Sequence, residues 1–407
     1  MDSSSTNEIT HDFPPFFKVY KDGSVERYMV FETVDAGHDA ITGVQSKDVV
    51  ISSETGVKAR IFIPKIDGPD RKLPLFVHYH GGGFCIGSAL GMRAKHMLTS
   101  LVSKGNIMAI SVDYRLAPEH TLPIAYEDSW AGLQWVATHS NGLGPEPWLN
   151  DHADLGRVFL GGESAGANIA HFVAVRAGTT TTGLAGLKVD GLLIVHPFFG
   201  GKEPDKMYKF LCPSSTGCDD DPRLNPEVDP NLKSMVADRV LVCVAEKDWL
   251  RNRGVAYYET LRKSSNGWNG NVELYETLGE DHCFHMFNPN SSSIGGVKEV
   301  DVEASKDCLG RYLRVMVVVD VTQALKRCLK VDVKGYGSFT IMSLRYKWLP
   351  NYCTLCRHIR HLFRECTVLK LPDEEVIPTE YGPWMRASSP VCNAANRDRM
   401  RVVDDRV

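Results

Sequence analysis

The sequence lacks any uninterrupted apolar run long enough to cross a membrane. A membrane-spanning helix needs roughly 18 or more consecutive apolar residues. The longest runs here, such as residues 315–319, have only the length of a strand. Residues 1–13 are polar and acidic and lack the apolar core of a signal peptide. We therefore expect a cytoplasmic protein, with the nucleus as the alternative compartment, and no membrane partner.

Cysteine pairs at regular spacings are also missing from the first 300 residues, and charge is unevenly spread along the chain. Of the 11 cysteines, five are scattered through the first 300 residues, which favours reduced thiols over a secreted disulfide framework. The net charge is −4, but from Lys306 onward 18 basic and 11 acidic residues give +7. The preceding part holds 28 basic and 39 acidic residues and carries −11. This asymmetry suggests that the two parts have different partners.

What the sequence does contain is a long alternation of strand and helix patterns. The chain has 407 residues, of which 43% are hydrophobic, so it can bury a large core. The expected strands are residues 48–53, 58–63, 73–80, 106–113, 157–161, 187–195, 239–245 and 272–276, and the expected helices are residues 92–103, 125–139 and 165–176. This order predicts an α/β fold with a mostly parallel sheet and helices on both faces. Residues 198–237, rich in Pro, Asp, Asn and Gly, are expected to be an insertion over the sheet's end.

The pentapeptide Gly162-Glu163-Ser164-Ala165-Gly166 matches G-x-S-x-G and lies between an expected strand and an expected helix. A nucleophile on such a tight turn needs small neighbours, which the two glycines supply. The first N–H groups of the helix are unpaired and carry partial positive charge near a developing anion. A glycine-rich turn without chemistry is the alternative for this pentapeptide alone.

A second glycine-rich motif, His80-Gly81-Gly82-Gly83, directly follows the expected strand 73–80. Consecutive glycines let backbone N–H groups face a ligand without obstruction. Two of these N–H groups and the N–H of Ala165 can form an oxyanion hole. Because α/β sheets place their sites at the carboxyl ends of strands, the two motifs together favour a catalytic site over a flexible loop.

A serine needs a base, and the base needs an orienting carboxylate. The chain order of this kind of site is serine, acid, histidine. Asp248 follows the strand 239–245, and Glu246 is the alternative acid. His282 follows the strand 272–276, and His285 is the alternative base.

Four segments together carry a family resemblance: HGGGFCIGSA, SVDYRLAPEH, GGESAGANIAH and the pair EKDWLR and EDHCFH. Over about residues 13–289 the chain resembles the plant carboxylesterases, which are hormone-sensitive-lipase-like α/β hydrolases and relatives of the gibberellin receptor. The resemblance implies an α/β-hydrolase fold with a lid made by the N-terminus and the insertion. It also implies hydrolysis of small-molecule carboxylic esters without a cofactor.

Residue by residue, the resemblance implies Ser164 as nucleophile, Asp248 as orienting acid and His282 as base. His282 is preferred because the family's histidine is the first of an H-x-F pair. The oxyanion donors would be Gly81, Gly82 and Ala165, and the substrate-binding residues would be Phe16, Phe17, His80 and Phe84. The gibberellin receptor lacks the catalytic histidine, so a binding protein without turnover is the alternative, which the presence of His282 disfavours.

Beyond residue 291 the chain resembles plant transposon-derived proteins that end in a zinc knuckle. Three thiols and one imidazole follow a Cys-x2-Cys-x4-His-x4-Cys spacing that can surround one Zn²⁺: Cys353, Cys356, His361 and Cys366. Basic and aromatic neighbours suit single-stranded nucleic acid. Arg357 and Arg360 stand where the family has glycines, and the alternative is a composite gene model or a decayed transposon insertion whose tail folds poorly. The expected domains are therefore the hydrolase at 1–290, the zinc-knuckle segment at 291–370 and a disordered end at 371–407, the last two forming a small irregular extension.

Overall fold

The computed structural model describes residues 8–287, apart from residues 67, 69–71, 181–183, 185 and 264–266, and four short strands beyond them. These strands form two antiparallel pairs, β12 (Glu299–Val300) with β13 (Val315–Met316), and β14 (Cys328–Val331) with β15 (Thr340–Ser343). The chain divides into two compact units, Met1–Val317 and Val318–Val407. The predicted zinc ligands and the predicted disordered end lie outside the described residues, so both stay predictions.

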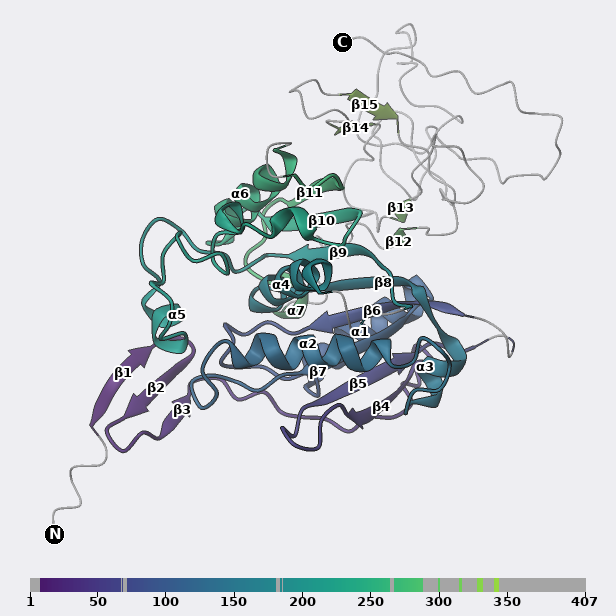
Figure 1. The fold of residues 1–407 in the computed structure, drawn as a ribbon, viewed down its shortest axis with the longest axis horizontal. Coiled ribbons are helices and arrows are strands. Elements are labelled where there is room, and N and C mark those ends of the chain that lie inside the picture. The colour runs from purple at the N-terminus through teal and green to yellow at the C-terminus, as the bar shows by residue number, and fades with distance from the viewer. Residues whose placement is uncertain are drawn as a thin grey trace, which may run out of the picture. The chain divides into compact units, whose positions relative to one another are not determined.

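An eight-stranded sheet forms the centre of the first unit (Figure 1). Its strands are β4 (Gln45–Val50), β5 (Lys58–Ile63), β6 (Leu73–Tyr79), β7 (Met108–Asp113), β8 (Ala153–Glu163), β9 (Val189–Val195), β10 (Arg239–Ala245) and β11 (Asn271–Thr277), in the spatial order β11-β10-β9-β8-β6-β7-β5-β4. The strands from β11 to β7 are parallel, and β5 and β4 are antiparallel additions at one edge. The predicted α/β-hydrolase fold with a mostly parallel sheet is confirmed.

Helices cover both faces because alternate side chains of the buried strands point to opposite sides. Phe62, Phe76 and Ala109 pack with α1 (Met92–Gly105) in one cluster. Their neighbours in the strands belong to the larger cluster on the other face, which includes residues of α2 (Ile124–Ala137), α4 (Ala165–Thr179) and α6 (Arg251–Arg262). Two further short α-helices of this part are α3 (Pro147–His152) and α7 (Phe284–Phe287). No helix within the described part of the chain is long and apolar enough to span a bilayer.

A small antiparallel sheet near the N-terminus was not predicted from the sequence. It consists of β1 (Ile9–Phe13), β2 (Phe17–Tyr20) and β3 (Val25–Arg27). The insertion contains α5 (Lys206–Leu211) and two short 3-10 helices, Pro226–Val228 and Leu232–Ser234. Phe210 of α5 packs against the small sheet, with ring centroids 4.5 Å from His11 and 5.2 Å from Phe13. The N-terminus and the insertion therefore form one layer, as expected for a two-part lid.

Helix α6 was also missed, and its composition explains why. It is rich in charged residues and contains a glycine, both of which weaken the helical pattern. Gly254 lies so close to β10 that a Cβ there would come within 2.6 Å of the Val244 Cγ1 atom. Close packing against the sheet thus selects a residue that local propensity disfavours.

Acidification is expected to destabilise this fold in part through His171, which lies on α4 and is 3% exposed. Its Nδ1 is 3.0 Å from the Tyr257 hydroxyl, and burial lowers its pKa from 6.5 to about 3. Between these values the unfolded chain binds a proton that the folded chain does not. Stability therefore falls as pH falls through this window, by about 1.4 kcal/mol per pH unit for one histidine.

Urea unfolding at about pH 7 and about pH 5 measures this loss of stability. The variant His171→Asn cannot titrate and can still accept the Tyr257 hydroxyl, so its loss on acidification should be smaller than that of the unmodified protein. Equal losses in the two proteins would show that the ring is already protonated in the fold.

Candidate active site

Ser164 lies on the turn between β8 and α4, at the carboxyl edge of the sheet. Its φ of +55° is unusual for a residue with a side chain, and the turn therefore carries backbone strain. The flanking glycines are required by space: a Cβ on Gly162 would lie 2.1 Å from the carbonyl oxygen of Tyr79, and one on Gly166 would lie 1.9 Å from it. Strand β6 thus passes directly beside the turn, which explains both glycines of the motif.

Asp248 and His282 approach Ser164 from two other strands of the sheet. Ser164 Oγ lies 3.1 Å from His282 Nε2, and His282 Nδ1 donates to Asp248 Oδ2 over 2.8 Å. Asp248 is 5% exposed, and its Oδ1 accepts the N–H of Leu250 over 2.7 Å. The three residues, at 164, 248 and 282 in the chain, form one line of hydrogen bonds in the predicted order.

The alternative acid and base lie elsewhere. Glu246 is exposed, and its Oε2 accepts the N–H of Gly279, so this carboxylate stabilises the loop that follows β11. The ring of His285 packs against His196 and Phe284, and burial lowers its pKa. Neither side chain has a hydrogen bond to His282 or Ser164 among the described residues. Of the four candidates, Asp248 and His282 are the two in line with Ser164 through hydrogen bonds.

The glycine loop (residues 80–83) lies beside Ser164, but its first glycine is already engaged. The N–H of Gly81 donates to Glu163 Oε1 over 2.7 Å, so it is not free for a substrate oxyanion. The N–H groups of Gly82, Gly83 and Ala165 have no acceptor within the described part of the chain. The set of free donors therefore differs from the expected set by one residue, with Gly83 in the place of Gly81.

Glu163, the variable position of G-x-S-x-G, holds the glycine loop in place. It is 2% exposed, and its Oε2 is 2.9 Å from His78 Nε2, whose ring also contacts the Ser111 hydroxyl. Burial raises the pKa of Glu163, but the charge and hydrogen bond of His78 and the N–H of Gly81 outweigh it and lower the pKa to about 2. A buried carboxylate thus fixes the loop that would face the substrate.

The expected substrate-binding residues divide into two groups. Phe17 and Phe84 are fully buried, Phe17 against the rings of the N-terminal layer and Phe84 against aromatic residues of the core. They offer no surface to a ligand, so their role is packing. His80 is also buried, with its ring stacked on Tyr114 at 4.2 Å and its Nδ1 2.7 Å from the Gly81 carbonyl oxygen. Its position makes it a support of the glycine loop.

Phe16 is the expected contact that does lie at the site. A Cβ placed on Gly83 would come within 2.9 Å of Phe16 Cε1 and within 3.3 Å of Met207 Cε, so both side chains cover the glycine loop. Beside His282, Trp249 is 56% exposed, and its ring centroid lies 6.1 Å from that of His282. Trp249 was missed, although a large aromatic residue directly after the acid was a visible signal.

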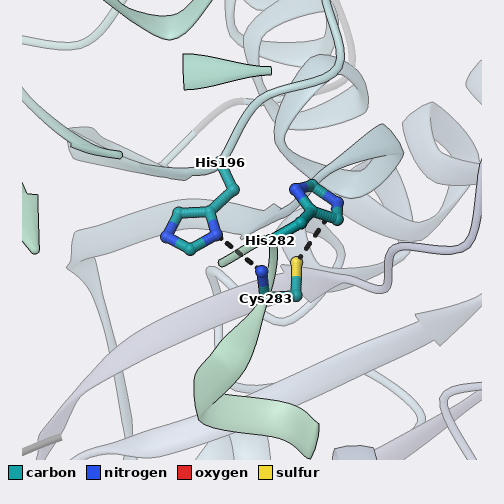
Figure 2. A group of neighbouring side chains, drawn as sticks. All are labelled: His196, His282 and Cys283. Carbon is teal, nitrogen blue, oxygen red and sulfur yellow. Dashed lines mark hydrogen bonds between the residues drawn. The ribbon is translucent and has the colours of Figure 1, made fainter. Parts of the chain in front are cut away.

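Three potential metal ligands gather beside Ser164: His196, His282 and Cys283, whose ligand atoms lie within 4.8 Å of one another (Figure 2). The imidazole nitrogens facing this space are already used, because His282 bonds Asp248 and Ser164, and His196 Nδ1 accepts the Cys283 N–H. Burial raises the pKa of the Cys283 thiol, which disfavours the thiolate that binds metals. The arrangement therefore suits proton transfer better than metal binding.

Comparison with known proteins agrees with this architecture. A family model described as the alpha/beta hydrolase fold matches residues 76–286. The chain belongs to the α/β-hydrolase fold family. The match includes the glycine loop, the turn at residues 162–166 and the positions of Asp248 and His282.

Curated plant proteins are similar to this hydrolase over most of their own length. It is 39% identical over 336 residues to a 2-hydroxyisoflavanone dehydratase of Glycyrrhiza echinata, covering 77% of this chain and 98% of that protein. It is 42% identical over 303 residues to probable carboxylesterase 2 of Arabidopsis thaliana, covering 70% and 93%. These relatives confirm the predicted resemblance to plant carboxylesterases.

Solved esterase structures share the fold. An esterase of Pyrobaculum calidifontis is 26% identical, with a TM-score of 0.50, and the match covers 61% of this hydrolase and 80% of that chain. A mutant of the esterase rPPE is 23% identical, with a TM-score of 0.52, covering 64% and 81%, and supports the fold alone. The predicted family and enzyme class, an esterase-type hydrolase, are confirmed.

Proposed function

We propose that this hydrolase is a serine carboxylesterase that cleaves small-molecule esters with Ser164, His282 and Asp248. The observation that carries the proposal is the line of hydrogen bonds from Ser164 Oγ through His282 to Asp248, with distances of 3.1 and 2.8 Å. Both lie within the range required for proton transfer between nucleophile, base and orienting acid. No cofactor is needed, because each group that moves a proton or forms a bond belongs to the chain.

The reaction has two halves. Ser164 Oγ attacks the ester carbonyl carbon while its proton passes to His282 Nε2, and Asp248 stabilises the imidazolium. The tetrahedral intermediate expels the alcohol, which takes the proton from His282, and leaves an acyl group on Ser164. Water, deprotonated by His282, then attacks the acyl group, and the acid leaves as Ser164 regains its proton.

Backbone N–H groups stabilise the oxyanion that forms in both halves. We assign this role to Gly82, Gly83 and Ala165, because their N–H groups are free whereas Gly81 donates to Glu163. Removal of one such donor typically costs ~3–4 kcal/mol of transition-state stabilisation. Fixing the loop through Glu163 means that little of this stabilisation is lost to ordering the loop during the reaction.

The substrate contacts point to an ester with an apolar portion. Phe16 and Met207 cover the glycine loop, and the half-exposed ring of Trp249 lies beside His282. Apolar and aromatic walls with few polar groups are typical of sites for uncharged small molecules. We therefore assign the binding of the acyl or alcohol group to Phe16 and Trp249, and support of the loop to His80.

A second candidate activity is elimination of water from a hydroxyl-bearing carbonyl compound, because a relative 39% identical over nearly its whole length is named a dehydratase. In that reaction His282 would remove a proton next to the carbonyl, and the oxyanion donors would hold the enolate. His282 would then pass that proton to the hydroxyl group, which would leave as water. Ser164 forms no bond in this route, so Ser164→Ala would abolish ester hydrolysis and spare elimination.

Binding without turnover is disfavoured here because it gives no role to the hydrogen bonds of His282. Zinc binding by residues 353–366 and nucleic-acid binding by the basic tail remain hypotheses based on the sequence.

The direct test uses the full chain with p-nitrophenyl acetate and butyrate. We expect turnover of both esters. We also expect a fluorophosphonate to label one serine per chain covalently and to abolish the turnover completely. A folded protein that neither hydrolyses these esters nor reacts with the fluorophosphonate would contradict the proposal.

A further inference from the structure

His196 is a buried histidine at the site that the reaction scheme does not use. It directly follows β9, is 2% exposed and has a φ of +46°. Its N–H donates to the carbonyl oxygen of Cys243 in β10 over 2.8 Å, and the residue before it, Val195, accepts the N–H of Ser164 over 2.9 Å. The end of β9 therefore holds the nucleophile turn on one side and is itself fixed to β10 on the other.

The imidazole of His196 is bonded to the segment that carries the base. Its Nδ1 accepts the N–H of Cys283, the residue after His282, over 2.7 Å, as Figure 2 shows. Cys283 has a φ of +50°, a conformation that a residue with a side chain adopts only when its surroundings enforce it. The bond from His196 is one such constraint, and it acts one residue away from the imidazole that must face Ser164.

The same bond decides which nitrogen of His196 carries the proton. Because Nδ1 accepts an N–H, it must be unprotonated, and the neutral ring carries its proton on Nε2. This matters because His196 Nδ1 lies only 3.5 Å from Asp248 Oδ2, the oxygen to which His282 donates. A proton on His196 Nδ1 would compete with His282 for that oxygen. Burial lowers the pKa of His196 to about 3, so the ring stays neutral near pH 7.

We propose that His196 is a positioning residue for catalysis: it fixes the His282 segment through the Cys283 N–H and leaves Asp248 Oδ2 to His282 alone. This inference rests on the proposed esterase function. It predicts an effect on kcat rather than on KM, since His196 is buried and, among the described residues, its ring has no hydrogen bond to Ser164 and no ring contact with Phe16 or Trp249.

Two substitutions of similar polarity separate positioning from packing. In His196→Asn the amide oxygen can occupy the place of Nδ1 and accept the Cys283 N–H. The Gln side chain of His196→Gln is one methylene longer, so its oxygen lies beyond that place and the hydrogen bond is lost. We expect kcat for p-nitrophenyl butyrate to fall by roughly 100-fold in His196→Gln and by less than about fivefold in His196→Asn, with KM little changed in both. His196→Ala, which removes the acceptor without adding length, should behave as His196→Gln does.

The control is His171→Asn, a substitution of another histidine that is 3% exposed but lies on α4 away from Ser164. It should lower the melting temperature and leave kcat unchanged. Rates are expressed per serine labelled at saturation by a fluorophosphonate, so that loss of folded protein is not counted as loss of rate.

Equal kcat values for His196→Asn, His196→Gln and the unmodified protein would overturn the positioning role while leaving the esterase function intact. Failure of both His196→Gln and His196→Ala to fold would also overturn it, in favour of a purely structural role. Absence of turnover in the unmodified protein would instead contradict the proposed function.

Discussion

Ser164→Ala is expected to lower kcat for p-nitrophenyl butyrate by roughly a millionfold. The reason is that Ser164 carries the hydroxyl hydrogen-bonded to His282, 3.1 Å from the nitrogen that would take its proton. The remaining oxyanion donors and substrate contacts can still assist water, so a small residual rate should persist. Turnover of p-nitrophenyl butyrate measures the loss of ester hydrolysis, and labelling by a fluorophosphonate independently measures the loss of the reactive serine.

The matched control for this change is Ser129→Ala. Ser129 is fully buried on α2, and its hydroxyl has no hydrogen-bond partner within the described part of the chain, so its removal should leave kcat and labelling unchanged. A Ser164→Ala protein that folds and keeps more than about a hundredth of the activity would exclude Ser164 as the nucleophile.

Asp248→Asn should produce the second largest effect, a fall in kcat of roughly 10,000-fold. The Asn oxygen can still accept the N–H of Leu250, so the loop after β10 should keep its conformation. The Asn amide would then face His282 as a donor. His282 would have to accept at Nδ1 and carry its proton on Nε2, where it cannot take the proton of Ser164. KM should change little, because Asp248 is buried behind His282.

Asp128→Asn is the control for removing a buried carboxylate. Asp128 is 3% exposed and makes a bidentate ion pair with Arg115, whose Nε and Nη2 lie 2.9 and 2.7 Å from the two carboxylate oxygens. Its loss should lower the free energy of unfolding without a comparable fall in kcat. If both aspartate variants lose activity to the same extent, the effect of Asp248→Asn is one of stability and not of proton transfer.

The sequence predicted the succession of strands along the chain and placed the candidate site at their carboxyl ends, because both follow from local patterns. Buried parallel strands are short, nearly continuous apolar runs. Their carboxyl ends meet at one edge of the sheet, so residues that follow them are brought together. Ser164, Asp248 and His282 each follow such a run, and Gly162 and Gly166 were expected from the space that a tight turn requires. The choices of Asp248 over Glu246 and of His282 over His285 agree with the geometry.

The errors concern contacts between distant residues. Gly81 was expected to be an oxyanion donor, but a buried carboxylate needs donors, and Glu163 takes the Gly81 N–H. Phe17 and Phe84 were expected at the substrate, but their rings are buried. An aromatic residue in a loop has the same local pattern whether it faces a ligand or the core. The small sheet β1–β3 was missed because its strands are short and depend on contacts with distant segments, such as Phe13 with Phe210 of α5 and Arg27 with Glu119.

By itself, then, the sequence determined the fold family, the nucleophile turn and the order of serine, acid and histidine, because these depend on apolar periodicity, glycine spacing and chain order. The tertiary structure alone decided which glycine N–H groups are free, which aromatic rings reach the site and why His196 is a histidine. Those properties depend on hydrogen bonds between residues such as Glu163 and Gly81, or His196 and Cys283, that lie more than 80 positions apart. No local pattern encodes such a pairing, since each partner satisfies its hydrogen bond only when the fold brings the two strands' ends together.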